Sequence, residues 1–279
     1  MVIDAHQHFC RFNPVRDAWI TDEMAAIRRD FLPEDLVPVL DACGVDATIA
    51  VQADQSEAET EFLLGLAEGN GRIAGVVGWV DLRSRDIERR LEHFSKFKKL
   101  RGVRHVAQAE PDDRFLVRPE FLRGVEKLQE FGLTYDVLIY PRQLPAAIEL
   151  VGKLPDQKFV VDHLAKPEIN AKKIEPWASH MRELAANPNV YCKLSGMVTE
   201  ADWKRWKPED FEPYLDVVFD AFGPQRLIFG SDWPVCLVAA TYGQVKNVVE
   251  TYVDRDAPSA KSAIFGENVK RFYQIQSLR

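Results

Sequence analysis

The chain has 279 residues, a length that suits one α/β barrel, and 46% of them are hydrophobic, which is enough for a large core. Its formal net charge of −7 at pH 7 argues against nucleic acid or an anionic membrane surface as the main partner. No apolar stretch is long enough to cross a bilayer, and no basic segment followed by an apolar run stands near the N-terminus. We therefore expect a cytoplasmic protein.

The four cysteines, Cys10, Cys43, Cys192 and Cys236, are scattered along the chain and form no CxxC pair. This spacing predicts neither a disulfide framework nor a structural zinc site, and it is typical of a reducing compartment.

Short β-branched runs alternate with longer amphipathic stretches along the whole chain. Eight runs predict buried strands at Val2–Ala5, Ala47–Val51, Ile73–Val80, Gly102–Val106, Thr134–Ile139, Phe159–Asp162, Val190–Leu194 and Leu227–Phe229. Eight helical patterns follow them at Pro33–Ala42, Ser56–Glu68, Arg85–Phe94, Pro119–Phe131, Leu144–Gly152, Trp177–Ala186, Pro208–Phe222 and Tyr242–Tyr252. We expect a last helix, Ser259–Tyr273, to pack outside the barrel or against one of its ends.

Strict alternation of strand and helix predicts parallel pairing, and eight units close a (β/α)8 TIM barrel. Ser56 and Glu59 form a capping box at the second helix, and Gly44, Gly132 and Gly152 stand just past helix ends. No linker-like or low-complexity stretch interrupts the pattern, so we expect one domain over residues 1–279. A doubly wound open sheet is the alternative, but no GxGxxG or GxxxxGK[ST] sequence follows any strand.

Polar residues follow the predicted strands, at the end where such barrels place their active sites. The first strand delivers His6 and His8, which share one face at spacing i, i+2. The sixth leads into Asp162 and His163, and the eighth into Ser231-Asp232-Trp233-Pro234. The remaining strand ends deliver Gln52 and Asp54, Trp79 and Asp81, Arg104 and His105, Tyr140, and Lys193 and Ser195, with Lys166 just beyond the sixth strand.

These groups suit hydrolysis. Imidazole nitrogens and a carboxylate are the ligand set of a catalytic Zn²⁺ with an open position for water, so His6, His8 and Asp232 predict a mononuclear metal site. Such an ion would polarise a carbonyl and lower the pKa of its bound water to about 7. In a metal-independent mechanism, Asp232 would be the general base and His6, His8 and His163 would hold the substrate carbonyl. The purely structural alternatives are a helix cap for Asp232 and a histidine bonded to Asp162 for His163.

Three stretches, "DAHQHF", "DHLAKP" and "IFGSDWP", occur in this order at the first, sixth and eighth strands. They resemble the amidohydrolase superfamily (the amidohydrolase-2 type) and in particular its sugar-lactone hydrolases, over nearly the whole chain to the closing "IFGENVKRFY". The resemblance implies a (β/α)8 barrel, His6 and His8 at the metal or carbonyl site, His163 on strand six and Asp232 as the water-activating carboxylate. It also implies a 6-deoxy-sugar lactone, such as L-fucono- or L-rhamnono-lactone, as the substrate that is opened to the aldonic acid.

The chain departs from the binuclear members, which use a bridging Lys or Glu on strand four and a His on strand five. Here these strands carry Arg104-His105, then Asp136 and Tyr140, so we do not expect two metal ions. The missing strand-five His also argues against the metal-dependent decarboxylases. A decarboxylase or amide hydrolase on this scaffold, and a barrel that only binds a sugar acid, remain the alternatives.

The other polar groups at the strand ends are candidate substrate ligands. Hydrogen bonds to ring hydroxyls or to the product carboxylate are expected from Gln52, Arg104, His105, Tyr140 and Lys166. Trp233, with Trp19 in the first loop, is expected to stack on the apolar face of a sugar ring.

Overall fold

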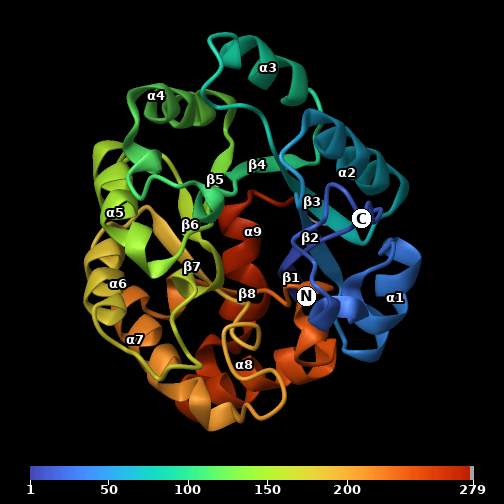
Figure 1. Cartoon of the computed structure of the whole chain (residues 1–279), viewed down its shortest axis with the longest axis vertical. Helices are drawn as coiled ribbons and strands as arrows, with labels where there is room; N and C mark the ends of the chain where they lie inside the picture. Colours follow the sequence, from blue (N-terminus) through green and yellow to red (C-terminus); the bar gives the residue numbers. More distant parts are fainter. Residues whose placement is uncertain (277–279) are drawn as a thin grey trace.

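The computed structural model describes residues 1–276, in which eight parallel strands stand side by side in sequence order inside a ring of helices (Figure 1). The strands are β1 (Ile3–Gln7), β2 (Ala47–Val51), β3 (Ile73–Gly78), β4 (Leu100–His105), β5 (Thr134–Val137), β6 (Phe159–Val161), β7 (Val190–Leu194) and β8 (Leu227–Phe229). The helices are α1 (Pro33–Ala42), α2 (Glu57–Gly69), α3 (Ile87–Phe94), α4 (Pro119–Leu128), α5 (Leu144–Lys153), α6 (Trp177–Ala185), α7 (Glu212–Phe222), α8 (Tyr242–Asp256) and α9 (Asn268–Phe272). The predicted (β/α)8 barrel is confirmed.

The barrel closes between β1 and the residues that follow β8. The Asp232 N–H donates to the His6 carbonyl at 2.8 Å, and the His8 N–H donates to the Trp233 carbonyl at 2.7 Å. The seam therefore joins the first and last motifs by main-chain hydrogen bonds, and it fixes Asp232 beside the two histidines.

The extra C-terminal helix is also confirmed, and it lies within the ring of strands in the view of Figure 1. Phe272 and Tyr273 pack in one apolar cluster with strand residues that include Ile3, Ile49 and Ile228. The predicted single helix is divided into a 3₁₀ turn (Pro258–Ala260), a π-helical segment (Ala263–Glu267) and α9. A larger apolar cluster fills the layer between the strands and the outer helices.

A β-bulge in β1 changes the direction of its side chains. Asp4 pairs with Thr48 and Gln7 with Ala50, so β1 has one more residue than β2 over this interval. Ile3 and Ala5 pack in the apolar cluster that also contains Phe272 and Tyr273. The extra residue lets His6 and His8 face the barrel interior as well. Strand alternation alone would turn His6 away from the side of Ala5.

No helix in residues 1–276 is both long enough and apolar enough to cross a membrane.

Candidate active site

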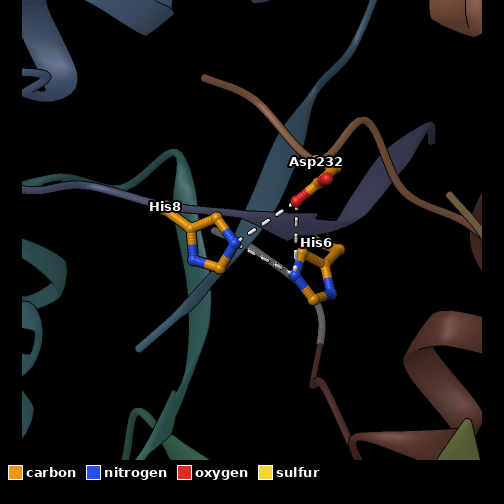
Figure 2. A group of neighbouring side chains, drawn as sticks. All are labelled: His6, His8 and Asp232. Carbon is orange, nitrogen blue, oxygen red and sulfur yellow. Dashed lines mark hydrogen bonds and ion pairs between the residues drawn. The ribbon is translucent and has the colours of Figure 1, made fainter. Parts of the chain in front are cut away.

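His6, His8 and Asp232 form a compact buried group at the seam (Figure 2). The Nε2 atoms of His6 and His8 lie 3.2 Å apart, and Oδ1 of Asp232 lies 3.8 Å from the first and 3.4 Å from the second. The three residues predicted as metal ligands therefore point at one another from two elements that are more than 220 residues apart in sequence.

The proton positions on His8 follow from its partners. Its Nδ1 lies 2.8 Å from the carbonyl of Val51, which can only accept a hydrogen bond. In the neutral ring the proton therefore resides on Nδ1, and Nε2 presents a lone pair to Asp232 and His6. Metal-binding histidines commonly donate their other ring N–H to a main-chain carbonyl in this way, so the donor set fits a divalent ion.

His163 joins this group from an unusual backbone. Residues His163, Leu164, Ala165 and Lys166 have φ between 52° and 57°, which is one turn of left-handed helix. This region disfavours L-residues by about 1–2 kcal/mol each, so the surrounding structure must stabilise the turn. Trp177 does so by donating its indole N–H to the Leu164 carbonyl at 2.7 Å. As a result, Nε2 of His163 lies 3.8 Å from Oδ1 of Asp232.

Two glycines make room for the histidines. A Cβ on Gly196 would lie 2.6 Å from Cγ of His163, and φ at this residue is +65°. A Cβ on Gly230 would lie 2.7 Å from Cβ of His6. The "SG" after β7 and the "GSD" after β8 are therefore shaped by the close approach of these side chains.

Burial and charge determine the protonation states. Burial alone would raise the pKa of Asp232, but the three imidazoles beside it, His163 first, together lower it well below its usual value of 3.8. Burial lowers the pKa of His163 to about 4. Burial and the neighbouring Lys193 charge lower the pKa of His6 well below 6.5. At neutral pH the site therefore combines an ionised Asp232 with neutral His6 and His163.

A layer of charged side chains lies directly beneath His6. Lys193 of β7 has no exposed surface, and its Nζ lies 2.5 Å from Oδ2 of Asp136 and 2.9 Å from Oδ1 of Asp162. Arg104 of β4 donates to Oδ2 of Asp162 at 3.1 Å. His6, Asp162 and His163 also have ligand-type geometry for a metal. Since Asp162 is already paired with two of the protein's own cations, a second metal ion has little charge to bind there.

Asp4 ties the bulge of β1 to the loop after β8. Its Oδ1 accepts the N–H groups of His6 (3.0 Å) and Ser231 (2.9 Å), and its Oδ2 accepts the hydroxyls of Ser231 (2.6 Å) and Tyr242 (3.0 Å). Burial raises the pKa of Asp4 to about 6 despite these bonds. One carboxylate thus links the main chains that carry His6 and Asp232.

The predicted substrate ligands fall into two groups near the site. Gln52 is buried and fixed to Arg104, whose guanidinium donates to both the carbonyl and the side-chain oxygen of Gln52. Tyr140 and Lys166 lie together, with Nζ of Lys166 5.6 Å from the centre of the Tyr140 ring and 3.2 Å from Oε1 of Glu200. These two side chains are partly exposed, whereas Gln52 and Arg104 are enclosed.

In the structure, neither His105 nor Trp233 presents an open surface to the group of His6, His8, His163 and Asp232. Alternation along β4 turns His105 away from the side of Arg104. Its ring stacks on Phe115 at 4.8 Å, and its Nε2 bonds Glu110 at 2.7 Å. Trp233 is 3% exposed and packs edge-on against Phe9 and Phe31. Trp19 is exposed in the first loop.

Sequence reasoning assigned no role to Asp4 or to Lys193, although both lie in the patterns it used. Asp4 begins the "DAHQHF" stretch, and Lys193 is a lysine within a predicted buried strand. A charged residue in a strand covered on both faces needs a buried partner, and that signal was available. Ser195, 2.8 Å from Nδ1 of His163, was noted only as a residue at a strand end.

Comparison with known proteins places the whole chain in one family. The family model for amidohydrolases matches residues 3–275. The L-fucono-1,5-lactonase of Burkholderia multivorans is 44% identical over 284 residues, covering 98% of this chain and 96% of the relative. A protein of the same name from Burkholderia ambifaria is 39% identical over 281 residues, covering 98% and 95%. The crystal structure of an amidohydrolase from Burkholderia multivorans with bound zinc has a TM-score of 0.95 and 43% identity, covering 99% and 100% of the two chains. The chain therefore belongs to the amidohydrolase family.

Proposed function

We propose that this protein hydrolyses the ring ester of a sugar lactone, and that L-fucono-1,5-lactone or a similar 6-deoxy-sugar lactone is its substrate. The observation that carries this proposal is the ionised Asp232 held within 3.8 Å of an imidazole nitrogen of each of three histidines. The two relatives named L-fucono-1,5-lactonase support the choice of lactone.

In the proposed reaction, Asp232 removes a proton from a water molecule as its oxygen adds to the lactone carbonyl carbon. The carbonyl oxygen that becomes negative would lie among His6, His8 and His163, where an N–H of His6 or His163 would stabilise it, because Nε2 of the neutral His8 ring has no proton to donate. The ring C–O bond then breaks, and the departing alkoxide takes the proton back from Asp232. A lactone suits this small set of groups because its leaving group is an alcohol that needs no strong general acid.

We propose one divalent ion, with zinc as the first choice, held by His6, His8 and Asp232. The bound ion would polarise the carbonyl and lower the pKa of water. A carboxylate with a low pKa is a weak base, so Asp232 benefits from a water molecule that is already acidified. The zinc in the similar crystal structure supports this choice.

Substrate recognition is assigned to the polar groups around this centre. We propose that Gln52 and Arg104 line its buried side and that Tyr140 and Lys166 bind hydroxyls or the aldonate carboxylate at its open side. His105 and Trp233 would act through packing. The barrel is proposed to be the single domain of residues 1–279, and its four free cysteines suit a cytoplasmic location.

A lactonase screen tests the proposal directly. Purified protein is incubated with a panel of aldono-1,4- and 1,5-lactones in weak buffer with a pH indicator, with and without a chelator. We expect acid release from 6-deoxy-sugar lactones, and a loss of about 10²–10⁴-fold in kcat/KM for Asp232→Asn. No turnover on any lactone, or full activity in Asp232→Asn, would contradict the proposal.

A further inference from the structure

A lysine and a glutamate lie side by side at the rim of the barrel mouth, close to the proposed reaction centre. Lys166 is the last residue of the left-handed turn that begins at His163, and its N–H donates to the His163 carbonyl at 2.7 Å. Glu200 lies in the loop after β7, and its Oε1 is 3.2 Å from Nζ of Lys166. The ring of Tyr140, which follows β5, has its centre 5.6 Å from the same Nζ. The ends of three neighbouring strands thus bring together a cation, a carboxylate and an aromatic ring.

The head groups of this pair have free hydrogen-bonding capacity for a ligand. The side chains of Lys166 and Glu200 are only 17% and 21% exposed, so the pair is partly enclosed at the rim. Within residues 1–276, neither the ammonium group nor the carboxylate has a second ion-pair or hydrogen-bond partner in the protein. An ammonium group has three donors, and the two oxygens of a carboxylate accept several hydrogen bonds. Hydroxyl groups, which both donate and accept, therefore suit this pair as ligands.

Each of the two cations beside Tyr140 has a carboxylate of its own. Arg142 lies 5.2 Å from the centre of the ring and its Nε bonds Asp113 at 2.7 Å, just as Lys166 is paired with Glu200. A ligand carboxylate that approached Lys166 would have to share one ammonium group with Glu200, and the two negative charges would repel each other. Specificity commonly depends on such a repulsive group as well as on attractive ones. This part of the rim therefore favours uncharged polar ligands over anionic ones.

We propose that Glu200 is a specificity-determining residue, which binds ring hydroxyls of a neutral sugar lactone together with Lys166 and excludes lactones that carry a carboxylate. This inference rests on the proposed lactonase function and deepens it. With the lactone carbonyl among the histidines, the far end of the molecule extends toward the rim, where the pair meets it. The role proposed for Lys166 is thereby narrowed to hydroxyls. A 6-deoxy-sugar lactone is uncharged and meets this requirement.

Two lactones that differ in a single group test the selection. The 1,4-lactones of L-galactonic acid and of galactaric acid carry CH₂OH and COO⁻, respectively, at the same terminal carbon. Steady-state hydrolysis gives kcat/KM for each, and the wild type should prefer the neutral lactone. Glu200→Gln keeps the size of the side chain but removes its charge, so the ratio of anionic to neutral kcat/KM should rise at least about tenfold. The rise should shrink in about 1 M salt, because the Debye length is then about 3 Å.

Two further variants show whether the rise comes from the ammonium group that Glu200→Gln sets free. The double variant Lys166→Met/Glu200→Gln removes one charge of each sign, and its ratio should return to within about threefold of the wild type. Glu168→Gln is the matched control, because it frees Lys173 in the same loop, but this pair is about half exposed. It should leave the ratio unchanged. An unchanged ratio in Glu200→Gln that is folded by circular dichroism, an equal rise in Glu168→Gln, or a rise that persists in the double variant would overturn the proposal.

Equilibrium binding of the open-chain acids separates this proposal from the lactonase function. Galactarate has two carboxylates and L-galactonate has one, and isothermal titration calorimetry measures the affinity for both without turnover. Glu200→Gln should bind galactarate at least about tenfold more tightly than the wild type, and L-galactonate by less than about threefold more tightly. If the wild type hydrolyses no lactone but galactarate binding tightens in this way, the lactonase function is wrong and the exclusion of anions stands. An unchanged or undetectable galactarate affinity in Glu200→Gln would overturn the inference, whatever the lactonase screen shows.

Discussion

The two halves of the barrel mouth direct their side chains by different means. On the side of β2 to β5, Arg104 and His105 follow the ordinary alternation of a strand. On the side of β6, β8 and β1, side chains are directed by a left-handed turn at 163–166, a positive φ of 57° at Asp232 and the bulge in β1. Within residues 1–276, every non-glycine residue with a positive φ lies at or after His163. Positive φ therefore coincides with the groups proposed to carry out the chemistry. The side of β2 to β5 has register shifts too, between β2 and β3 and between β3 and β4, but residues 47–137 include no non-glycine residue with a positive φ.

After Asp232→Asn, the largest expected loss of activity comes from filling the space beside His163. In Gly196→Ala, the new Cβ would meet the His163 ring at 2.6 Å and push it away from Asp232. A displacement of about 1 Å in a catalytic group lowers activity by about 10²-fold, and we expect this loss in kcat/KM from steady-state lactone hydrolysis.

Gly132→Ala separates this clash from backbone strain. Gly132 has φ of +67°, and a Cβ there would have no neighbour within 4 Å. It should lower the free energy of unfolding by about 1 kcal/mol and leave kcat/KM unchanged. Equal activity in the two variants would show that the space beside His163 is not required.

The difference between the halves also explains what the sequence could predict. The eight strands, and the convergence of His6, His8, His163 and Asp232, follow from hydrophobic periodicity and from the position of the strand ends. The bulge and the left-handed turn do not, because they depend on tertiary contacts such as Asp4 with Ser231 and Trp177 with Leu164. For the same reason, the two-residue period of a strand could not predict that the side chains of both Ala5 and His6 point into the barrel.

The same alternation limits what could be said of His105. A strand end identifies which residues lie near the mouth, but the face each one occupies depends on the register of its strand. The strand that carries Lys193 was predicted, but the contact of this side chain with His6 depends on how three neighbouring strands pack together. Both assignments required the three-dimensional structure.

Asp4 offers a second way to disturb the strained half. Asp4→Ala leaves the N–H groups of His6 and Ser231 without their buried acceptor, so we expect a loss of about 3 kcal/mol in unfolding free energy and about tenfold in kcat/KM. Asp4→Asn keeps one oxygen for these two N–H groups, and its amide can donate to the hydroxyls of Ser231 and Tyr242. Its activity should remain near that of the wild type, and equal losses in both variants would contradict the linking role of Asp4.

The two Asp4 variants also differ in pH dependence. Because the pKa of Asp4 is raised from 3.8 to about 6 in the folded state, its stabilising contribution is full below pH 3.8 and is lost as the pH rises through about 6. Asn does not titrate. The unfolding free energy of Asp4→Asn relative to the wild type should therefore rise by about 3 kcal/mol between pH 3.5 and 7, as measured by urea denaturation.

The pH dependence of activity tests the electrostatics of the same half. Burial lowers the pKa of His163 to about 4, and its protonation would place a cation beside Asp232 and weaken that base. We expect kcat/KM to stay level from pH 7 to pH 5 and to fall below about pH 4. A decline centred near 6.5, the usual pKa of histidine, would mean that His163 is solvated during turnover.

The smallest effect on activity is expected in the regular half, from His105→Gln. The imidazole accepts the indole N–H of Trp79 at 3.3 Å, bonds Glu110 and stacks on Phe115, so its replacement removes packing behind β4 rather than a group at the centre. We expect the free energy of unfolding to fall by about 1–2 kcal/mol and kcat/KM to change by less than about threefold. A large rise in KM with unchanged stability would instead assign His105 to substrate binding. The side of β2 to β5 would then contribute a further side chain to recognition, beside Gln52 and Arg104, and the two halves of the mouth would differ only in the strain of their backbones.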